Sequence, residues 1–187
     1  MSRVTLVLGG ARSGKSRFAE GLATGHRGRK TYIATAEAFD DEMRERIAHH
    51  RLRRGEGWET REAPLDLVVT LQSCETGFVL IDCLTLWISN LMHANRDVGR
   101  EVASLCAALK KSKARVALVS NEVGLGIVPE NALARRFRDE QGLANQRLAE
   151  VADEVFFAAA GLPLTLKAKS PKPAPARKAK SARGRKR

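Results

Sequence analysis

Short apolar runs alternate with helical patterns along most of the chain. The apolar runs predict strands over residues 3–8, 31–35, 78–82, 115–120, 155–159 and 162–166, the last two on either side of Gly161. Apolar positions at helical spacing predict helices over residues 15–22, 40–54, 84–91 and 102–109. A longer helix is predicted after Pro129, with Gly142 as a break in it. Such alternation is typical of an α/β fold with a mostly parallel sheet covered by helices.

A glycine-rich loop follows the first predicted strand and precedes the first predicted helix. It fits the phosphate-binding pattern G-x-x-x-x-G-K-[ST], with the residues Gly9, Gly10, Ala11, Arg12, Ser13, Gly14, Lys15 and Ser16. Glycines let the backbone N–H groups and the start of the helix surround phosphate oxygens. Lys15 can reach the β- and γ-phosphates, and Ser16 can bind Mg²⁺. The sequence therefore predicts a nucleotide site in a P-loop NTPase-like α/β fold.

Polar residues end two of the other predicted strands. The apolar run over residues 78–82 ends in Asp82. Alone, such an aspartate more often caps the next helix, but beside a phosphate loop we favour Asp82 as the acid that holds Mg²⁺ directly or through water. Asn121 and Glu122 follow the strand over residues 115–120, and ligands of open α/β sheets gather at the carboxyl ends of strands. These two residues are placed to touch substrate or metal, unless the segment is an ordinary glycine-rich connection.

The predicted helix over residues 40–54 is strongly basic and contains His49 and His50. His50 lies three residues after Ile47 and seven after Met43, so it shares their inward face. Neighbouring arginines oppose its protonation, and a neutral imidazole beside a bound triphosphate is a competent nucleophile toward phosphorus. The arginines can also stabilise phosphate charge. The alternative interpretation is a solvated basic face without a catalytic role.

Four segments together resemble one enzyme family. They are GGARSGKS, DDEMRERIAHHRLRR, the strand ending in IDC with LTLWISNL after it, and residues 120–155. Over residues 3–167 the chain is similar to the bifunctional adenosylcobinamide kinase / adenosylcobinamide-phosphate guanylyltransferase family of cobalamin biosynthesis. The resemblance implies a bacterial cytoplasmic enzyme that phosphorylates adenosylcobinamide with ATP or GTP. It then transfers GMP from GTP to adenosylcobinamide phosphate, giving adenosyl-GDP-cobinamide and pyrophosphate.

The same resemblance implies a guanylylated histidine, a homotrimer and a set of site residues. One histidine of the pair His49-His50 matches the guanylylated histidine, and the helical phase selects His50, because adjacent helical residues point about 100° apart. The family's nucleotide contacts match the eight residues of the glycine-rich loop and also Ala34, Thr35, Ala36, Arg51, Leu52, Arg53, Arg54, Glu62 and Asp82. Some members carry Glu at the position of Asp82, which keeps the charge but changes its reach.

The positive charge is concentrated at the end of the chain. The 187 residues carry a net charge of +12, but residues 168–187 hold nine Lys or Arg and no acid, which leaves +3 on the rest. We therefore expect one domain over residues 1–167 and a disordered basic tail over residues 168–187. The tail is either a solubilising extension or an arm that binds RNA, DNA or acidic lipid weakly.

Two competing functions follow from the same features. One is a plain small-molecule P-loop kinase whose basic helix only binds phosphates. The other is a nucleotide-gated nucleic-acid-binding protein, which the modest charge of residues 1–167 disfavours. The three cysteines contain no C-x-x-C pair, which fits a reducing cytoplasm better than a disulfide scaffold or a structural zinc site. No apolar stretch approaches the ~18 residues of a membrane span, and the first strand is too short for a signal peptide.

Overall fold

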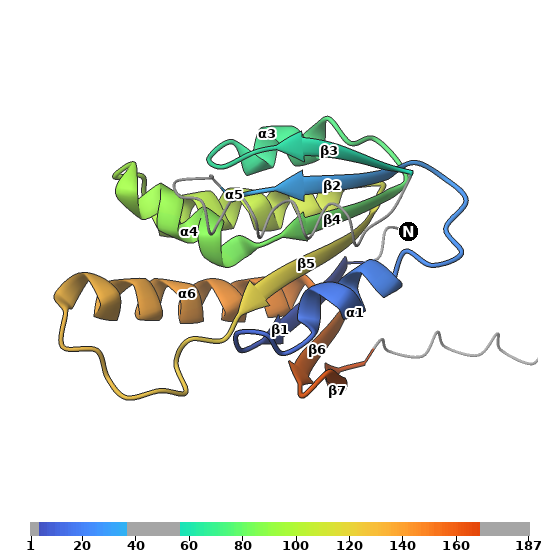
Figure 1. The fold of residues 1–187 in the computed structure, drawn as a ribbon. Helices are drawn as coiled ribbons and strands as arrows, with labels where there is room; N and C mark the ends of the chain where they lie inside the picture. Colours follow the sequence, from blue (N-terminus) through green and yellow to red (C-terminus); the bar gives the residue numbers. More distant parts are fainter. Residues whose placement is uncertain (1–3, 37–56, 169–187) are drawn as a thin grey trace, which may run out of the picture.

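The structure is a computed structural model that describes residues 4–36 and 57–168 (Figure 1). The helix predicted over residues 40–54 and almost all of the tail lie outside these residues. In chain order the elements are β1 (Val4–Gly9), α1 (Lys15–Gly21), β2 (Lys30–Ala34), β3 (Trp58–Glu62), α3 (Leu67–Gln72), β4 (Phe78–Asp82), α4 (Leu84–His93), α5 (Val98–Lys111), β5 (Arg115–Asn121), α6 (Ala132–Val151), β6 (Glu154–Ala159) and β7 (Leu162–Lys167).

The strands form one seven-stranded sheet in the order β3-β2-β4-β5-β1-β6-β7. Each neighbouring pair is parallel except β6 and β7, which are antiparallel. This arrangement confirms the predicted α/β fold with a mostly parallel sheet covered by helices. Because parallel strands end at a common edge, the carboxyl ends of β1 to β5 lie together. β5 separates β1, which leads into the phosphate loop, from β4, which ends in Asp82.

Helices cover both faces of the sheet (Figure 1). The larger core lies under α3, α4, α5 and α6, and the smaller core lies under α1. Side chains along a strand alternate between faces. In β4, Val79 and Ile81 belong to the larger core, whereas Phe78 and Leu80 belong to the core under α1. Asp82 therefore projects on the face that carries α1.

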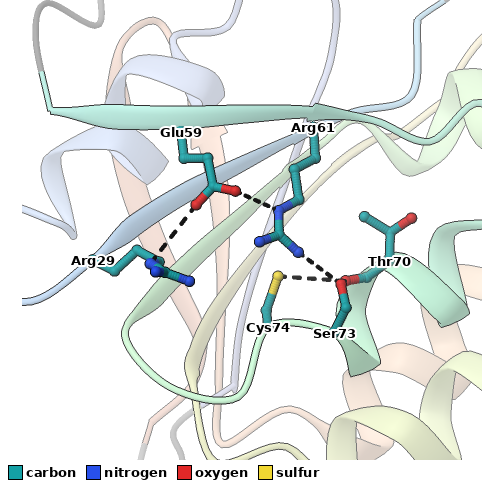
Figure 2. A network of polar contacts seen from close by, with 6 residues as sticks. All are labelled: Arg29, Glu59, Arg61, Thr70, Ser73 and Cys74. Atoms are coloured by element: carbon teal, nitrogen blue, oxygen red, sulfur yellow. Dashed lines mark hydrogen bonds and ion pairs between the residues drawn. The ribbon is translucent and has the colours of Figure 1, made fainter.

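The edge strand β3 and the helix α3 were not predicted from the sequence. β3 reads WETRE and has no buried side chain, so it lacks the apolar run of the other strands. Figure 2 shows the polar contacts around it: Arg61 donates from Nε to Glu59 at 2.8 Å and from Nη1 to the Ser73 hydroxyl at 2.7 Å. Arg29 adds an ion pair to Glu59 at 3.8 Å. Because Ser73 follows α3 directly, these contacts tie the edge strand to that helix.

Two predicted helices differ from the structure by more than two residues at an end or by their continuity: one begins earlier than expected, and the other is continuous where a break was predicted. α5 begins four residues earlier than expected, behind Asp97, whose carboxylate accepts a hydrogen bond from the Arg100 N–H at 3.0 Å. α6 runs through Gly142 without a break, so the prediction of an interruption there was wrong. A glycine inside a helix costs only about 1 kcal/mol, which the packing of a 20-residue helix can offset. In residues 4–36 and 57–168 no helix combines the length and apolar character needed to cross a membrane.

Candidate nucleotide-binding site

The phosphate loop connects β1 to α1 and packs closely against the turn between β6 and β7. Gly14 has φ +92°, and a Cβ atom there would lie 3.0 Å from the Cα of Gly161. The N–H of Gly161 donates to the carbonyl of Ser13 at 2.9 Å. At Gly9 a Cβ atom would lie 2.5 Å from the carbonyl oxygen of Ala158. These close approaches explain why glycines stand at both ends of the loop.

The cation of the motif lies over this loop. The Lys15 ammonium donates to the carbonyl oxygen of Gly10 at 2.8 Å, which folds the side chain back along the loop. α1 begins at Lys15, so the loop and the first helical turn present their backbone N–H groups at the same end of the sheet. Ser16 is the second residue of α1 and is partly buried. The strand, loop and helix that the motif requires are therefore present, and phosphate binding by these residues stays a prediction.

Three further predicted nucleotide contacts lie in one row across the sheet. Ala34, at the end of β2, is in register with Glu62 of β3 and with Asp82 of β4. Ala34 packs against the core under α1, and residues in register on parallel strands share a face. Glu62 and Asp82 therefore project on the face that carries α1. The structure thus brings these residues and the phosphate loop to one edge and one face of the sheet.

The Thr35 side chain holds the backbone next to Asp82 in place. Its hydroxyl donates to the carbonyl of Cys83 at 2.6 Å and accepts from the N–H of Cys83 at 2.9 Å. The Asn90 amide of α4 donates to the carbonyls of Thr35 at 2.9 Å and Pro64 at 3.1 Å. Together these bonds fix the segments that follow β2, β3 and β4. Direct contact of Thr35, and of its neighbour Ala36, with nucleotide stays a prediction.

Cys83, next to the predicted metal ligand, is held as a neutral thiol. Burial, and after it the negative charge of Asp82, raise the pKa of this thiol from 9.0 to about 11, with Lys15 opposing the shift. A thiol with a raised pKa is a poor nucleophile near neutral pH. Cys83 is therefore a packing residue of the site and not a reactive group.

A second polar cluster fixes the end of β5. The N–H of Asn121 donates to the Thr85 hydroxyl of α4 at 2.8 Å, and its carbonyl accepts from the Asn145 amide of α6 at 3.1 Å. Behind them, the Ser120 hydroxyl donates to the Asn145 side-chain oxygen at 2.7 Å, and the Gln141 amide donates to Ser120 at 2.8 Å. Sequence reasoning missed this cluster, although polar residues at i and i+4 among the apolar positions of α6 were a usable signal.

The basic segment lies outside the described residues. It contains the predicted nucleophile His50, its neighbour His49, and the predicted contacts Arg51, Leu52, Arg53 and Arg54. Their approach to the phosphate loop stays a prediction.

Comparison with known proteins identifies the family of this chain. The family described as cobinamide kinase / cobinamide phosphate guanyltransferase matches residues 5–166. The bifunctional adenosylcobalamin biosynthesis protein CobP of Pseudomonas aeruginosa is 49% identical over 166 residues, which cover 87% of this chain and 96% of the relative. The bifunctional adenosylcobalamin biosynthesis protein CobU of Salmonella typhimurium is 43% identical over 179 residues, which cover 87% and 98%.

Among solved structures, one that this chain resembles is the KaiC-like protein PH0186 of Pyrococcus horikoshii OT3. It is 12% identical with a TM-score of 0.48, and the match covers 83% of this chain and 70% of that chain. The similarity to CobP and CobU confirms the resemblance and the enzyme class expected from the sequence. The family match over residues 5–166 confirms them as well. The chain belongs to the cobinamide kinase / cobinamide phosphate guanyltransferase family.

Proposed function

We propose that this chain catalyses two successive reactions of cobalamin biosynthesis. The first phosphorylates the hydroxyl of the aminopropanol arm of adenosylcobinamide with ATP or GTP. The second transfers GMP from GTP to adenosylcobinamide phosphate. The observation that carries the proposal is a phosphate loop that shares one edge and one face of the sheet with Asp82, in a chain of this family.

In the kinase step the substrate hydroxyl oxygen attacks the γ-phosphorus. The bond from that phosphorus to the β–γ bridging oxygen breaks, ADP or GDP leaves, and the hydroxyl proton is released. Lys15 and the N–H groups of the loop neutralise the charge that spreads over the phosphate oxygens. The Ser16 hydroxyl and the Asp82 carboxylate are hard oxygen donors that fit Mg²⁺, which neutralises the β- and γ-phosphates when bound.

In the guanylyltransferase step a nitrogen of His50 attacks the α-phosphorus of GTP. A phosphorus–nitrogen bond forms, the bond to the α–β bridging oxygen breaks, and pyrophosphate leaves beside Arg51, Arg53 and Arg54. A phosphate oxygen of adenosylcobinamide phosphate then attacks the same phosphorus. The phosphorus–nitrogen bond breaks, adenosyl-GDP-cobinamide is released and the neutral imidazole is restored.

Intact-mass measurement after incubation with GTP and Mg²⁺, with and without adenosylcobinamide, tests this scheme. We expect a covalent GMP adduct on the wild-type chain that disappears when the phosphorylated acceptor exceeds the remaining GTP. His50→Ala is expected to abolish the adduct and the guanylyltransferase reaction while kinase activity partly survives, whereas His49→Ala keeps the adduct. GMP mapped to His49 would reverse the assignment. A wild-type chain that phosphorylates the acceptor but forms no adduct would indicate a plain P-loop kinase.

We also propose a homotrimer in the cytoplasm whose basic tail binds polyanions weakly. The trimer is implied by the family resemblance, and exposed apolar side chains between β5 and α6, at Leu125, Ile127 and Val128, support a covering partner copy. The cytoplasmic location is supported by three cysteines that are free thiols. The nine cations of residues 168–187 support polyanion binding. Light scattering during size-exclusion chromatography would show three times the chain mass, and a monomer would contradict the proposal.

A further inference from the structure

The two polar residues at the end of β5 have different surroundings. Glu122 directs its carboxylate into its own loop, where Oε1 accepts a hydrogen bond from the N–H of Gly124. Asn121 is partly exposed, and within residues 4–36 and 57–168 its side-chain nitrogen donates no hydrogen bond. Of the two residues, Asn121 is therefore the one that has a hydrogen-bond donor to offer to a ligand.

The alternation of β5 places this donor on the face of the phosphate loop. Ala117 and Val119 pack in the core under α1, so Asn121, two residues after Val119, projects on the same face. Asn121 is in register with Gly9, the first residue of the phosphate loop, and the N–H of Glu122 donates to the carbonyl of Gly9 at 3.1 Å. On the other side, β5 pairs with β4, which ends in Asp82. The donor therefore lies between the phosphate loop and the predicted metal ligand.

The backbone of Asn121 is held on both sides by side chains from two different helices. Thr85 accepts from its N–H and Asn145 donates to its carbonyl, and these two side chains are only 7% and 6% exposed. Asn145 is in turn fixed by Ser120 and Gln141, which are fully buried. Buried polar groups cost desolvation, and the hydrogen bonds that they do make hold their partners in a defined geometry; among the described residues only Oε1 of Gln141 in this cluster lacks a hydrogen-bond partner. Here the hydrogen bonds fix the backbone of Asn121 at the carboxyl end of β5, beside the phosphate loop.

We propose that Asn121 donates its side-chain N–H to a phosphate oxygen of the bound nucleotide during phosphoryl transfer. In this scheme Thr85 and Asn145 are positioning residues that hold Asn121 in place. A neutral amide donor stabilises the charge that develops on the transferred phosphoryl group, and it lacks the repulsion that a carboxylate would exert. The inference rests on the proposed kinase reaction.

Initial rates of the kinase reaction with the full chain, ATP and adenosylcobinamide test the inference. Asn121→Ala is expected to lower kcat about ten- to a hundred-fold with little change in the KM for ATP, as for a contact made mainly in the transition state. Asn121→Asp is expected to lower kcat further, because it replaces a donor with a negative charge. Thr85→Val should lower kcat about tenfold, because small displacements at a reacting centre are costly, and Thr85→Ser should restore most of it.

Matched controls separate this role from a loss of folding. Thr70→Val is the control for Thr85→Val, because Thr70 lies in α3 and its hydroxyl bonds only the carbonyl of Asp66 in the described residues. Melting temperatures of all variants would be compared, and if Thr85→Val fails to fold, the partly exposed Asn121 still carries the test. Wild-type kcat in Asn121→Ala, or equal kcat in Thr85→Val and Thr85→Ser, would overturn the inference. An inactive wild-type chain would instead overturn the proposed kinase reaction and this inference with it.

Discussion

Gly14 combines a left-handed backbone with a close backbone contact, and both exclude a side chain. Its φ is +92°, and a Cβ atom would lie 3.0 Å from the Cα of Gly161 in the turn between β6 and β7. The left-handed conformation costs a residue with a Cβ atom about 1–2 kcal/mol. Forcing apart a packed contact costs about 1–3 kcal/mol more. We therefore expect Gly14→Ala to lower the free energy of unfolding by about 2–5 kcal/mol.

Gly25→Ala is the matched control for this substitution. Gly25 also has a left-handed backbone, with φ +78°, but a Cβ atom there would meet no other heavy atom within 4 Å. This variant is expected to lose only the conformational part, about 1–2 kcal/mol. Equilibrium unfolding in urea measures both losses, and in a chain of this size each kcal/mol lowers the melting temperature by roughly 2–4 °C.

The difference between the two variants isolates the contact with Gly161. Nucleotide affinity, measured by calorimetry, should fall in Gly14→Ala, because the phosphate loop has to move away from the turn. It should stay near the wild-type value in Gly25→Ala. Equal losses of stability in the two variants would show that the contact with Gly161 contributes nothing, and no loss in either variant would refute the conformational argument itself.

Three further outcomes are expected. Lys15→Ala should sharply lower the initial rates of both reactions, because it removes the cation that faces the β- and γ-phosphates; near-normal kinase activity would place the nucleotide elsewhere. Truncation after Lys167 should leave the melting temperature and both activities unchanged and weaken polyanion binding at low salt, so a large drop in melting temperature would contradict a disordered tail. Folding raises the pKa of Cys83 from 9.0 to about 11, so its stabilising contribution is complete below pH 9.0 and is lost as the pH rises toward 11. Urea unfolding at increasing pH should show a loss of roughly 2–3 kcal/mol over that range that is missing in Cys83→Ala.

The elements that carry the phosphate loop and Asp82 could be predicted because local sequence determines them. An apolar run, a glycine-rich loop and a helical pattern follow one another at the start of the chain, and this order fits few other structures. The run that ends in Asp82 is buried in the centre of the sheet, so it is apolar on both faces. In these segments the burial of each side chain follows directly from its type.

The edge strand and the polar clusters could not be predicted because their stability comes from distant partners. β3 is a polar segment that is a strand only because β2 pairs with it and Arg61 reaches Ser73. Thr35 and Asn145 look like surface residues in the sequence, and their burial depends on the carbonyl groups that they meet in the folded chain. Gly142 looks like a helix breaker until the neighbouring turns of α6 are packed on the sheet.

The position of β5 between β1 and β4 sets the order in which a working site can be assembled. The phosphate loop follows β1, and Asp82 ends β4. These two strands are joined in the sheet only through β5, which lies between them and is synthesised after both. Such long-range parallel pairing is slow, because the chain must close large loops before it gains contacts. A nucleotide that contacts the ends of both β1 and β4 can bind only the completed sheet. Above its dissociation constant, it would therefore raise the free energy of unfolding of the whole sheet in proportion to the logarithm of its concentration. Added nucleoside triphosphate is therefore expected to raise the melting temperature of the whole sheet and not only of the phosphate loop.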